Sequence, residues 1–198
     1  MLLREFCHIH SGYTARARLE PLPGEGGIPA IQLRDAGSDR EIVGHDLQRY
    51  DLGELPDRYF VHGGEVVFRS RGKPNTATVV SYDLIEPAAV IVPLIIMRPD
   101  KERVLPEYLA WAINQSDAQR QLGTEAQGTS LRMVPMSVLE RLEIAVPDLQ
   151  TQHRIVNLSA LSKREGRLLH ELAARREQLT NFILGEAAKL ANKQETNQ

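Results

Sequence analysis

The stretch that follows Pro147 constrains the fold more than any other part of this 198-residue chain, because it contains no further proline. Apolar side chains recur there at spacings of three and four residues, the pattern of one face of an α-helix. At about 1.5 Å per residue, a helix from Asp148 to about Leu190 would be roughly 60 Å long. Such a helix extends beyond its own domain, so the pattern predicts a partner helix. The predicted dimerisation stripe consists of Ile155, Leu158, Leu161, Leu168, Leu169, Leu172, Leu179, Phe182 and Ile183.

Polar and charged residues interrupt this stripe. With Ile155 at one core position of a heptad, later core positions include Ser162, Glu165 and Arg176. An interrupted seam favours packing against another helix over a long, regular coiled coil. Gly166 lowers helix stability by about 1 kcal/mol relative to alanine and marks a place where the helix could bend. The alternative is therefore a helix that folds back as a hairpin near Gly166.

The first part of the chain has short apolar or alternating runs between clusters of Gly, Pro, Asp and Asn, which is typical of a strand-rich domain. The candidate strands cover residues 30–33, 65–68, 76–81 and 90–96. The longest apolar run, residues 88–97, is interrupted by Pro93 and is far shorter than the roughly 20 residues of a membrane helix. It predicts a buried pair of strands and no membrane anchor.

A helical pattern begins at Pro106, a residue that suits the first turn of a helix, and Gly123 favours a C-terminal stop. We expect one helix over residues 106–123, a short helix over residues 135–142 and a strand over residues 142–146. Asp148 is the expected N-cap of the long helix.

These patterns predict an α+β fold class. A strand-rich globular domain with a few helices covers residues 1–147, a long helix that pairs with another helix covers residues 148–192, and a disordered tail covers residues 193–198.

Cysteine content and the N-terminal sequence indicate the compartment. The single cysteine, Cys7, cannot form an intramolecular disulfide. The N-terminal sequence MLLREFCHIH places charges too close to its few apolar residues for a signal peptide. We therefore expect a cytoplasmic protein.

The net charge of −2 argues against a general polyanion-binding protein. Up to Pro147 the chain has 16 Lys and Arg against 20 Asp and Glu, and beyond it 8 against 6. Three windows of the acidic first part nevertheless contain no carboxylate: residues 6–19, 66–82 and 126–139. If these windows meet in space, they form a local positive face on an acidic body. The alternative is that the three gaps arise by chance.

An enzyme is the less favoured interpretation. The segment PDRYFVHGGEVVF resembles the PD-(D/E)xK nuclease pattern through Asp57 and Glu65, but Val67 occupies the position of the lysine. The sequence has no GxxxxGK(S/T) phosphate loop, no GxGxxG after a strand and no GxSxG elbow. We therefore predict a non-catalytic protein.

A metal site is also disfavoured. Cys7, His8 and His10 are chemically suitable zinc ligands, but a structural site needs four ligands. His45 and His62 do not supply an evident second pair, so alternation along a strand explains the spacing better.

The three windows contain the candidate DNA-binding residues. In residues 68–80, two arginines alternate with small residues before a Pro-Asn turn, and guanidinium groups suit phosphates or the guanine edge. Residues 11–18 and 126–132 likewise combine small polar residues with arginines, which suits phosphate contacts. A solvated hairpin tip is the alternative for residues 68–80. The candidates are Ser11, Tyr13, Thr14, Arg16, Arg18, Arg69, Ser70, Arg71, Lys73, Asn75, Thr129, Ser130 and Arg132.

The order of the pieces resembles one half of the specificity subunit of Type I restriction-modification enzymes. The pieces are SGYTARAR, IPAIQLRDAG, GGEVVFRSRG, LPEYLAWAIN and GTSLRMVPMSVLERLEIAVPDLQTQHRIV, followed by the long helix. The most specific part is the last, in which a Gly-Thr-Ser turn, a short helix and a strand ending in Val-Pro precede a Gln and then Ile-Val.

The resemblance implies a target recognition domain that reads double-stranded DNA, joined to a helix that acts as a spacer and docks methyltransferase (modification) subunits. Members usually carry two such domains and two such helices, whereas this chain has one of each. The resemblance therefore implies a homodimer in which the two long helices pair as an antiparallel coiled coil, and which reads a bipartite target. No cofactor is expected on this chain, because S-adenosylmethionine would belong to the modification subunit. It stays open whether a restriction subunit accompanies the complex.

The leading alternative is a protein-interaction adaptor that assembles a complex through its helical stalk without reading DNA. The acidic balance before Pro147 supports it.

Overall fold

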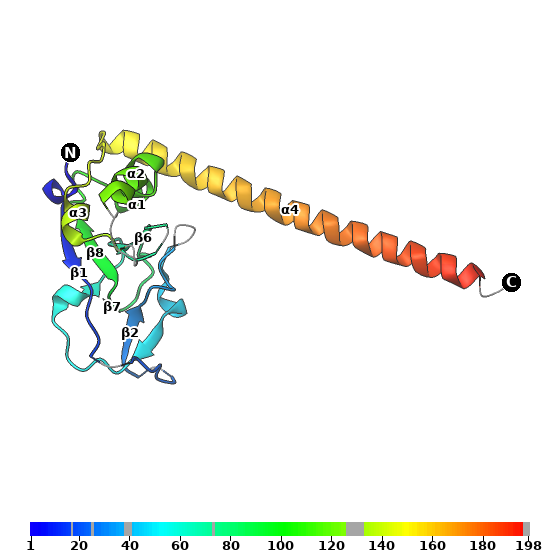
Figure 1. Cartoon of the computed structure of the whole chain (residues 1–198), viewed down its shortest axis with the longest axis horizontal. Helices are drawn as coiled ribbons and strands as arrows, with labels where there is room; N and C mark the ends of the chain where they lie inside the picture. Colours follow the sequence, from blue (N-terminus) through cyan, green and yellow to red (C-terminus); the bar gives the residue numbers. More distant parts are fainter. Residues whose placement is uncertain (17, 25, 38–40, 73, 126–132, 196–198) are drawn as a thin grey trace. The chain divides into compact units, whose positions relative to one another are not determined.

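The computed structural model describes residues 1–16, 18–24, 26–37, 41–72, 74–125 and 133–195 (Figure 1). The chain divides into two compact units, Met1–Arg154 and Ile155–Gln198. The described residues of the first unit form two four-stranded sheets with short helices, and one long helix continues through the second unit. The predicted α+β class and the long C-terminal helix are confirmed.

The first sheet has the strand order β1-β8-β5-β6, with every pair antiparallel. Its central strands are β8 (Leu94–Pro99) and β5 (Val66–Arg69), and its edges are β1 (Cys7–Ser11) and β6 (Ala77–Val79). Alternate side chains of these strands point to opposite faces, so each of the two central strands contributes to two packing layers.

The second sheet has the order β3-β2-β7-β4. Its strands are β3 (Gln48–Tyr50), β2 (Ile28–Ile31), β7 (Ala88–Val90) and β4 (Phe60–Val61). The pair β2 and β7 is parallel, and the other two pairs are antiparallel. The predicted pair of strands in residues 88–97 is confirmed as β7 and β8, and these strands belong to different sheets.

Apolar side chains of both sheets pack together in one buried cluster. It includes Val67 and Ile96 from the first sheet and Ile31 and Val90 from the second. A smaller cluster around Tyr50 and other residues of the second sheet is covered by half-buried side chains, among them Tyr13 and Leu19. Helix α1 (Pro106–Ile113) lies against β5 and β6, and α3 (Met136–Glu140) lies against β1. Three single turns of 3-10 helix complete the unit: Leu3–Glu5, Gly44–Asp46 and Asp57–Tyr59.

The prediction of one helix over residues 106–123 is wrong, because the chain forms α1 and then α2 (Ser116–Glu125). Asn114 lies at the break and pairs with the free edge of β6. Its Oδ1 accepts a hydrogen bond from the Ala77 amide at 2.9 Å, and its Nδ2 donates to the Ala77 carbonyl at 2.8 Å. Helix α2 also continues through Gly123, so that glycine is not the C-terminal stop.

The short helix near residue 136 is confirmed as α3, but the strand expected over residues 142–146 is reduced to one bridge between Leu2 and Glu143. The N-terminal residues hold this stretch instead. Leu3 donates its amide to the Leu142 carbonyl at 2.9 Å, and Ile144 donates to the Met1 carbonyl at 3.0 Å.

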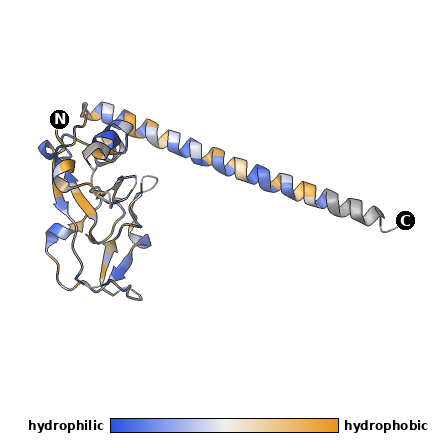
Figure 2. Cartoon of the chain, viewed as in Figure 1, coloured by the Kyte–Doolittle hydropathy of each residue, from blue (hydrophilic) through white to orange (hydrophobic). Residues whose placement is uncertain are grey.

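Helix α4 (Leu149–Glu195) begins where Asp148 was expected to cap it. The Thr151 amide donates to Asp148 Oδ1 at 2.9 Å, and this hydrogen bond lowers the pKa of the carboxyl group. The helix is continuous through Gly166, so the hairpin alternative is wrong. It also covers the first residues of the stretch expected to be disordered. Figure 2 shows hydrophobic and hydrophilic residues alternating along it, and no helix among the described residues is apolar enough over a sufficient length to cross a membrane.

Gln152 ties the first turn of α4 to the first unit. Its side chain is fully buried, and its Oε1 accepts a hydrogen bond from the Leu105 amide at 2.8 Å. Its Nε2 donates to the carbonyls of Arg103 at 2.9 Å and Pro147 at 2.7 Å. Because all three partners are backbone groups, this one amide satisfies polar groups that would otherwise lack hydrogen bonds inside the unit.

Replacement of this amide by an apolar side chain should therefore be costly. We expect Gln152→Leu to lower the free energy of unfolding by on the order of 3 kcal/mol, because three backbone groups lose their partner. Gln150→Leu is the matched control, since Gln150 is exposed, and its effect should stay within about 0.5 kcal/mol. Urea unfolding of both variants measures the difference, and equal midpoints would contradict the role of Gln152.

Candidate nucleic-acid interface

The connection between β7 and β8, residues 91–93, is where the chain passes from the second sheet to the first. We call these residues the corner. The Val92–Pro93 peptide bond is cis, and the Leu94 amide donates to the Ile91 carbonyl at 3.0 Å. The tight turn leaves Val92 38% exposed at the surface. Two of the three carboxylate-free windows contact the corner directly. The third window contacts the second one next to the corner.

The first window reaches the corner through Gly12 and Tyr13. The Gly12 amide donates to the Leu94 carbonyl at 3.0 Å, and the Val92 amide donates to the Tyr13 carbonyl at 3.0 Å. A Cβ atom on Gly12 would lie 2.8 Å from the Val90 oxygen and 2.9 Å from the Leu94 oxygen. Only glycine therefore lets this segment lie against the corner without displacing backbone atoms.

The second window reaches the corner through the end of β5. Arg69 is paired with Leu94 across the sheet, and the Ser70 amide and hydroxyl both donate to the Pro93 carbonyl. Burial alternates along the next residues: Arg69 is half-buried, Ser70 is buried and Arg71 is exposed. The two arginines therefore share the outer side of an extended segment, as the sequence predicts. Gly72 follows with a φ of +99°, a left-handed conformation that favours glycine.

The described end of the third window lies beside the second. Met133 forms an antiparallel bridge with Arg71, and the Val134 amide donates to the Ser70 carbonyl at 2.8 Å. Met133 is 50% exposed. The structure thus brings segments from residues 11–13, 69–71 and 133–134 together around the corner. We call the surface formed by Ser11, Arg69, Arg71, Val92 and Met133 the corner face.

Several arginines outside the windows contact a carboxylate. The pairs are Arg34–Asp35, Arg49–Glu86, Arg98–Glu65 and Arg120–Asp117. The described residues offer no carboxylate partner to four window arginines, which are Arg16, Arg18, Arg69 and Arg71. Arg69 donates its Nε to the Arg71 carbonyl at 3.2 Å. Guanidinium groups without a carboxylate partner remain available for an external anion.

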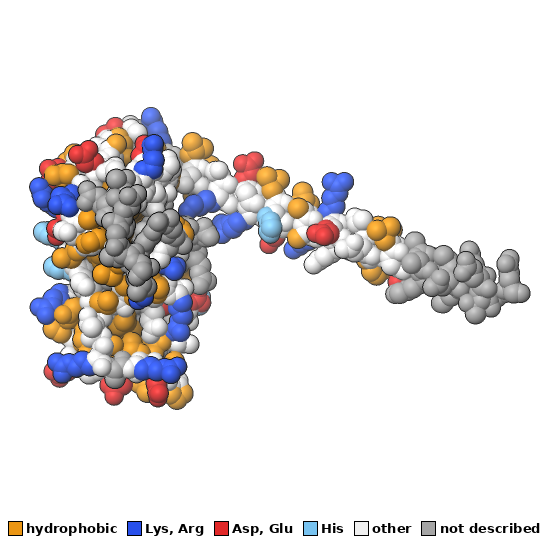
Figure 3. Space-filling view, viewed as in Figure 1, with side chains coloured by type: hydrophobic (Ala, Val, Ile, Leu, Met, Phe, Trp, Pro, Cys, Tyr) orange, Lys and Arg blue, Asp and Glu red, His pale blue; other side chains and the backbone are white. Residues whose placement is uncertain are grey.

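Overall charge does not mark the site. In the view of Figure 3, Lys and Arg side chains are scattered over the first unit, with Asp and Glu beside them along its lower edge. At the corner face, two arginines lie close together without a carboxylate partner among the described residues. This explains why an acidic domain can still present groups that suit an anion.

Three candidates from the sequence have structural roles. Ser70 is buried and its hydroxyl donates to Pro93, so it does not face an external ligand. Asn75 donates its Nδ2 to the carbonyls of Arg69 at 3.1 Å and Ser70 at 2.9 Å, which closes the hairpin between β5 and β6. The half-buried Tyr13 ring packs edge-on to Tyr59 with centroids 5.5 Å apart. Ser70 and Asn75 therefore support the segment that carries Arg69 and Arg71, and the Tyr13 ring supports the packing beside Tyr59.

The other candidates fall into two groups. Ser11 and Thr14 are exposed, as are Arg16 and Arg18, which lie on the segment between Tyr13 and Leu19. Within the described part of the chain, no hydrogen bond or ion pair links these two arginines to the corner face. The remaining four lie outside the described residues, and they are Lys73, Thr129, Ser130 and Arg132.

Sequence reasoning missed Gln119 and Val92. Gln119, on α2, donates its Nε2 to the Asn75 carbonyl at 2.7 Å and so supports the β5–β6 hairpin from outside the sheet. No local pattern marks this contact. Val92 could have been found from the position of Pro93, because a proline within an apolar run places its neighbour in a turn.

Cys7, Glu65 and Val67, which were considered for metal binding or nuclease chemistry, have structural surroundings. Burial raises the pKa of the Cys7 thiol to about 12, and among the described residues no three His, Cys, Asp or Glu side chains form a group that could hold a metal ion. Glu65 contacts Arg98 at 2.9 Å and accepts the His62 amide at 3.1 Å, while Val67 is buried in the core. Glu65 therefore stabilises a turn and an ion pair.

The close approach at Gly12 can be tested by substitution. We expect Gly12→Ala to lower the free energy of unfolding by about 1–3 kcal/mol, because the new methyl group overlaps two carbonyl oxygens. Gly26→Ala is the control, since nothing lies within 4 Å of its added Cβ atom. Thermal unfolding of both variants measures the effect, and a Gly12→Ala protein as stable as the control would refute the packing described at the corner.

No protein-family model and no curated protein matches this sequence. Solved structures do match its fold. The HsdS subunit from Thermoanaerobacter tengcongensis aligns with a TM-score of 0.67 and 21% identity over 92% of this chain and 46% of that chain. A chain from a study of complex assembly and conformational transition of the type I R-M system aligns with a TM-score of 0.63 and 18% identity over 89% of this chain and 40% of that one.

The type I restriction-modification system S subunit from M. genitalium aligns with a TM-score of 0.54 and 15% identity over 85% of this chain and 40% of that chain. This chain spans less than half the length of each of these three proteins. Its fold is that of the S subunits of type I restriction-modification systems.

Proposed function

We propose that this chain is a sequence-specific DNA recognition subunit of a Type I restriction-modification (DNA methyltransferase) complex. The observation that carries the proposal is the convergence of three carboxylate-free windows at the corner face, with arginines that have no acidic partner among the described residues. The S-subunit fold supports the same function.

The corner face offers two kinds of DNA contact. Arg71 is exposed and Arg69 is half-buried beside it, so their guanidinium groups can form paired hydrogen bonds with phosphates or with guanine O6 and N7. Arg16 and Arg18, on an exposed segment, suit phosphate contacts that fix the position of the duplex. Lys73 and Arg132 belong to the same windows and complete the proposed set.

The second unit is the proposed means of pairing. The stripe residues from Leu158 to Ile183 are between 55% and 70% exposed on the isolated helix. Full burial of one leucine contributes about 1.5–3 kcal/mol, so eight such side chains provide a strong drive for association. We propose that a second copy covers this stripe, giving a homodimer with two recognition domains and therefore a target with two half-sites.

Catalysis would reside in other subunits. Methyltransferase subunits would dock on the complex and bring S-adenosylmethionine, while this chain would supply recognition without a cofactor of its own. A cytoplasmic location, beside the DNA that the complex reads, agrees with this function.

A protein-interaction adaptor is the second candidate, favoured by the excess of 20 carboxylates over 16 cations up to Pro147. It shares the helical pairing but not the use of the corner face. Wild-type protein that fails to bind duplex DNA even at low salt would favour the adaptor.

The corner face can be tested through the salt dependence of DNA binding. We expect Arg71→Ala to weaken binding to a mixed-sequence duplex and to reduce the slope of log affinity against log salt by about 1, because one phosphate contact is lost. Arg4→Ala is the control, since exposed Arg4 precedes the end of β1 that is remote from the corner. Fluorescence anisotropy at several salt concentrations gives both slopes, and equal slopes would argue against the corner face.

The proposed dimer can be tested by light scattering. We expect wild-type protein to have the mass of a dimer and Leu172→Glu to be a folded monomer, because a carboxylate in the buried stripe is costly. Ala174→Glu introduces the same charge at an exposed position outside the stripe and should remain dimeric. A wild-type monomer at tens of micromolar, on the order of the concentrations where weak dimers assemble, would contradict pairing through this helix.

A further inference from the structure

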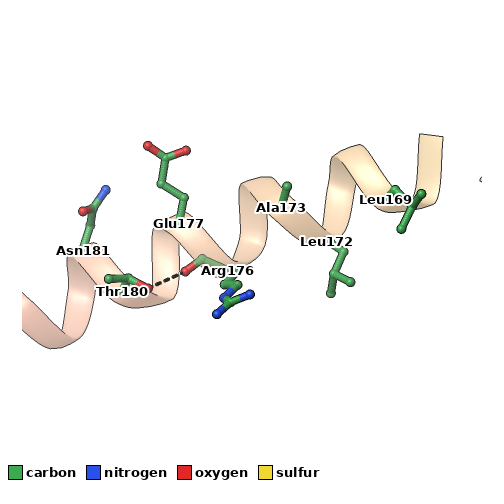
Figure 4. A pocket seen from close by; sticks show the side chains of 7 residues that line it. All are labelled: Leu169, Leu172, Ala173, Arg176, Glu177, Thr180 and Asn181. Atoms are coloured by element: carbon green, nitrogen blue, oxygen red, sulfur yellow. Dashed lines mark hydrogen bonds between the residues drawn. The ribbon is translucent and has the colours of Figure 1, made fainter. Parts of the chain in front are cut away.

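Between Leu158 and Ile183, two charged side chains interrupt the apolar stripe of α4. Glu165 lies seven residues after Leu158 and Arg176 lies seven residues before Ile183, so both occupy core positions of the heptad. Figure 4 shows Arg176 on the same side of the helix as Leu172, while Glu177 and Asn181 point the other way. The stripe therefore carries one negative and one positive charge in line with its leucines.

Among the described residues of α4, neither charge has an oppositely charged neighbour three or four positions away. The residues three and four positions from Glu165 are Leu161, Ser162, Leu168 and Leu169. Those around Arg176 are Leu172, Ala173, Leu179 and Thr180. Side chains at these spacings are the neighbours on a helix surface, so an intrahelical ion pair is not available. Burial of the stripe would leave both charges without compensation unless the partner supplies it.

The positions of the two charges are symmetric. In an antiparallel pair related by a twofold axis, the sum of the residue numbers that face each other is constant. If Leu158 faces Ile183, then Glu165 faces Arg176 and Leu169 faces Leu172. In this register the Leu158–Ile183 and Leu169–Leu172 positions are apolar on both sides, and Glu165 faces its opposite charge. Leu179 faces the small, uncharged Ser162.

Building on the proposed function, we propose that α4 pairs with a second copy in this antiparallel register, held by two symmetric Glu165–Arg176 ion pairs. These residues act as positioning residues that select the orientation and register of the dimer. The stripe supplies the association energy, and the charges determine which arrangement can form.

The competing arrangements all leave the charges poorly matched. A parallel pair in register places Glu165 against Glu165 and Arg176 against Arg176, which repel. An antiparallel pair shifted by one heptad places Glu165 opposite Leu169 or Ile183, and Arg176 opposite Leu158 or Leu172. Each shift buries charges without partners, which is costly.

The same pattern identifies the partner. A helix that complements this stripe must place a cation opposite Glu165 and an anion opposite Arg176, eleven residues apart and in reversed order. A second copy of α4 satisfies this condition without any other protein. Self-complementarity of charge therefore favours a homodimer over pairing with an unrelated helix.

Charge exchange tests the proposal. We expect Glu165→Arg alone and Arg176→Glu alone to raise the dimer dissociation constant by about tenfold or more, because like charges then face each other in two places. The double exchange, Glu165→Arg with Arg176→Glu, should restore the wild-type constant. Sedimentation equilibrium measures all four proteins, and circular dichroism checks that each retains its helix.

The possible outcomes separate this inference from the proposed function. A wild-type monomer would refute the dimer itself, and with it the proposed pairing function. If the wild type is a dimer and both single variants have the same dissociation constant as the wild type, the register is refuted but the dimer is not. A parallel dimer would give this result, because like charges face each other in all four proteins. Single variants that weaken the dimer and a double variant that does not restore it would also overturn the proposal.

An engineered disulfide between the two chains identifies the register directly. We expect oxidised Leu158→Cys/Ile183→Cys protein to form disulfides between residue 158 of one chain and residue 183 of the other, identified by mass spectrometry of linked peptides. A link within one chain is excluded, because 25 helical residues span about 37 Å. Leu158→Cys/Leu172→Cys is the control and should form no such cross-link. Links between two copies of residue 158, or an intact dimer without links, would overturn the proposed register.

Discussion

Backbone hydrogen bonds around the corner hold the candidate site in place. Amides from Gly12, Val92 and Ser70 meet carbonyls of Leu94, Tyr13 and Pro93 within a few residues of the point where the chain leaves one sheet for the other. The core between the sheets and the register of β5 against β8 both depend on this crossing. Arg69 is the last residue of β5 and Arg71 follows it by two residues, so backbone pairing fixes where both side chains start. A rigid support of this kind is what precise DNA contacts require.

The second unit is stabilised in a different way from the first. Helix α4 is stabilised locally by its N-cap and by the absence of proline, yet its apolar stripe remains exposed in the single chain. The hollow beside Leu169, Leu172 and Arg176 is lined by residues of this one helix (Figure 4). In the proposed dimer, different residues would supply association energy and specificity. Leucines would provide the first, and the two charges at Glu165 and Arg176 would provide the second.

Local patterns in the sequence were sufficient for much of the fold. Pro93 divides the apolar run into β7 and β8, Asp148 caps α4, and the heptad spacing continues through Gly166. Features that depend on distant contacts were not accessible. The break between α1 and α2 arises because Asn114 pairs with the edge of β6, 37 residues away. Similarly, Ser70 and Asn75 have the composition of a binding loop, but their polar groups are used within the fold. Residue type alone does not reveal whether a polar side chain already has hydrogen-bond partners within the fold.

The most direct test of DNA recognition by a symmetric dimer is selection of bound sequences from a library of random duplexes, followed by sequencing. Recognition by two identical domains related by a twofold axis should enrich one short sequence twice, in inverted orientation, across an unread gap of fixed length. The gap would be constant because the same helix pair separates the two domains in every complex. No enrichment at any salt concentration, or enrichment of a single unrepeated site, would contradict DNA recognition by a symmetric dimer.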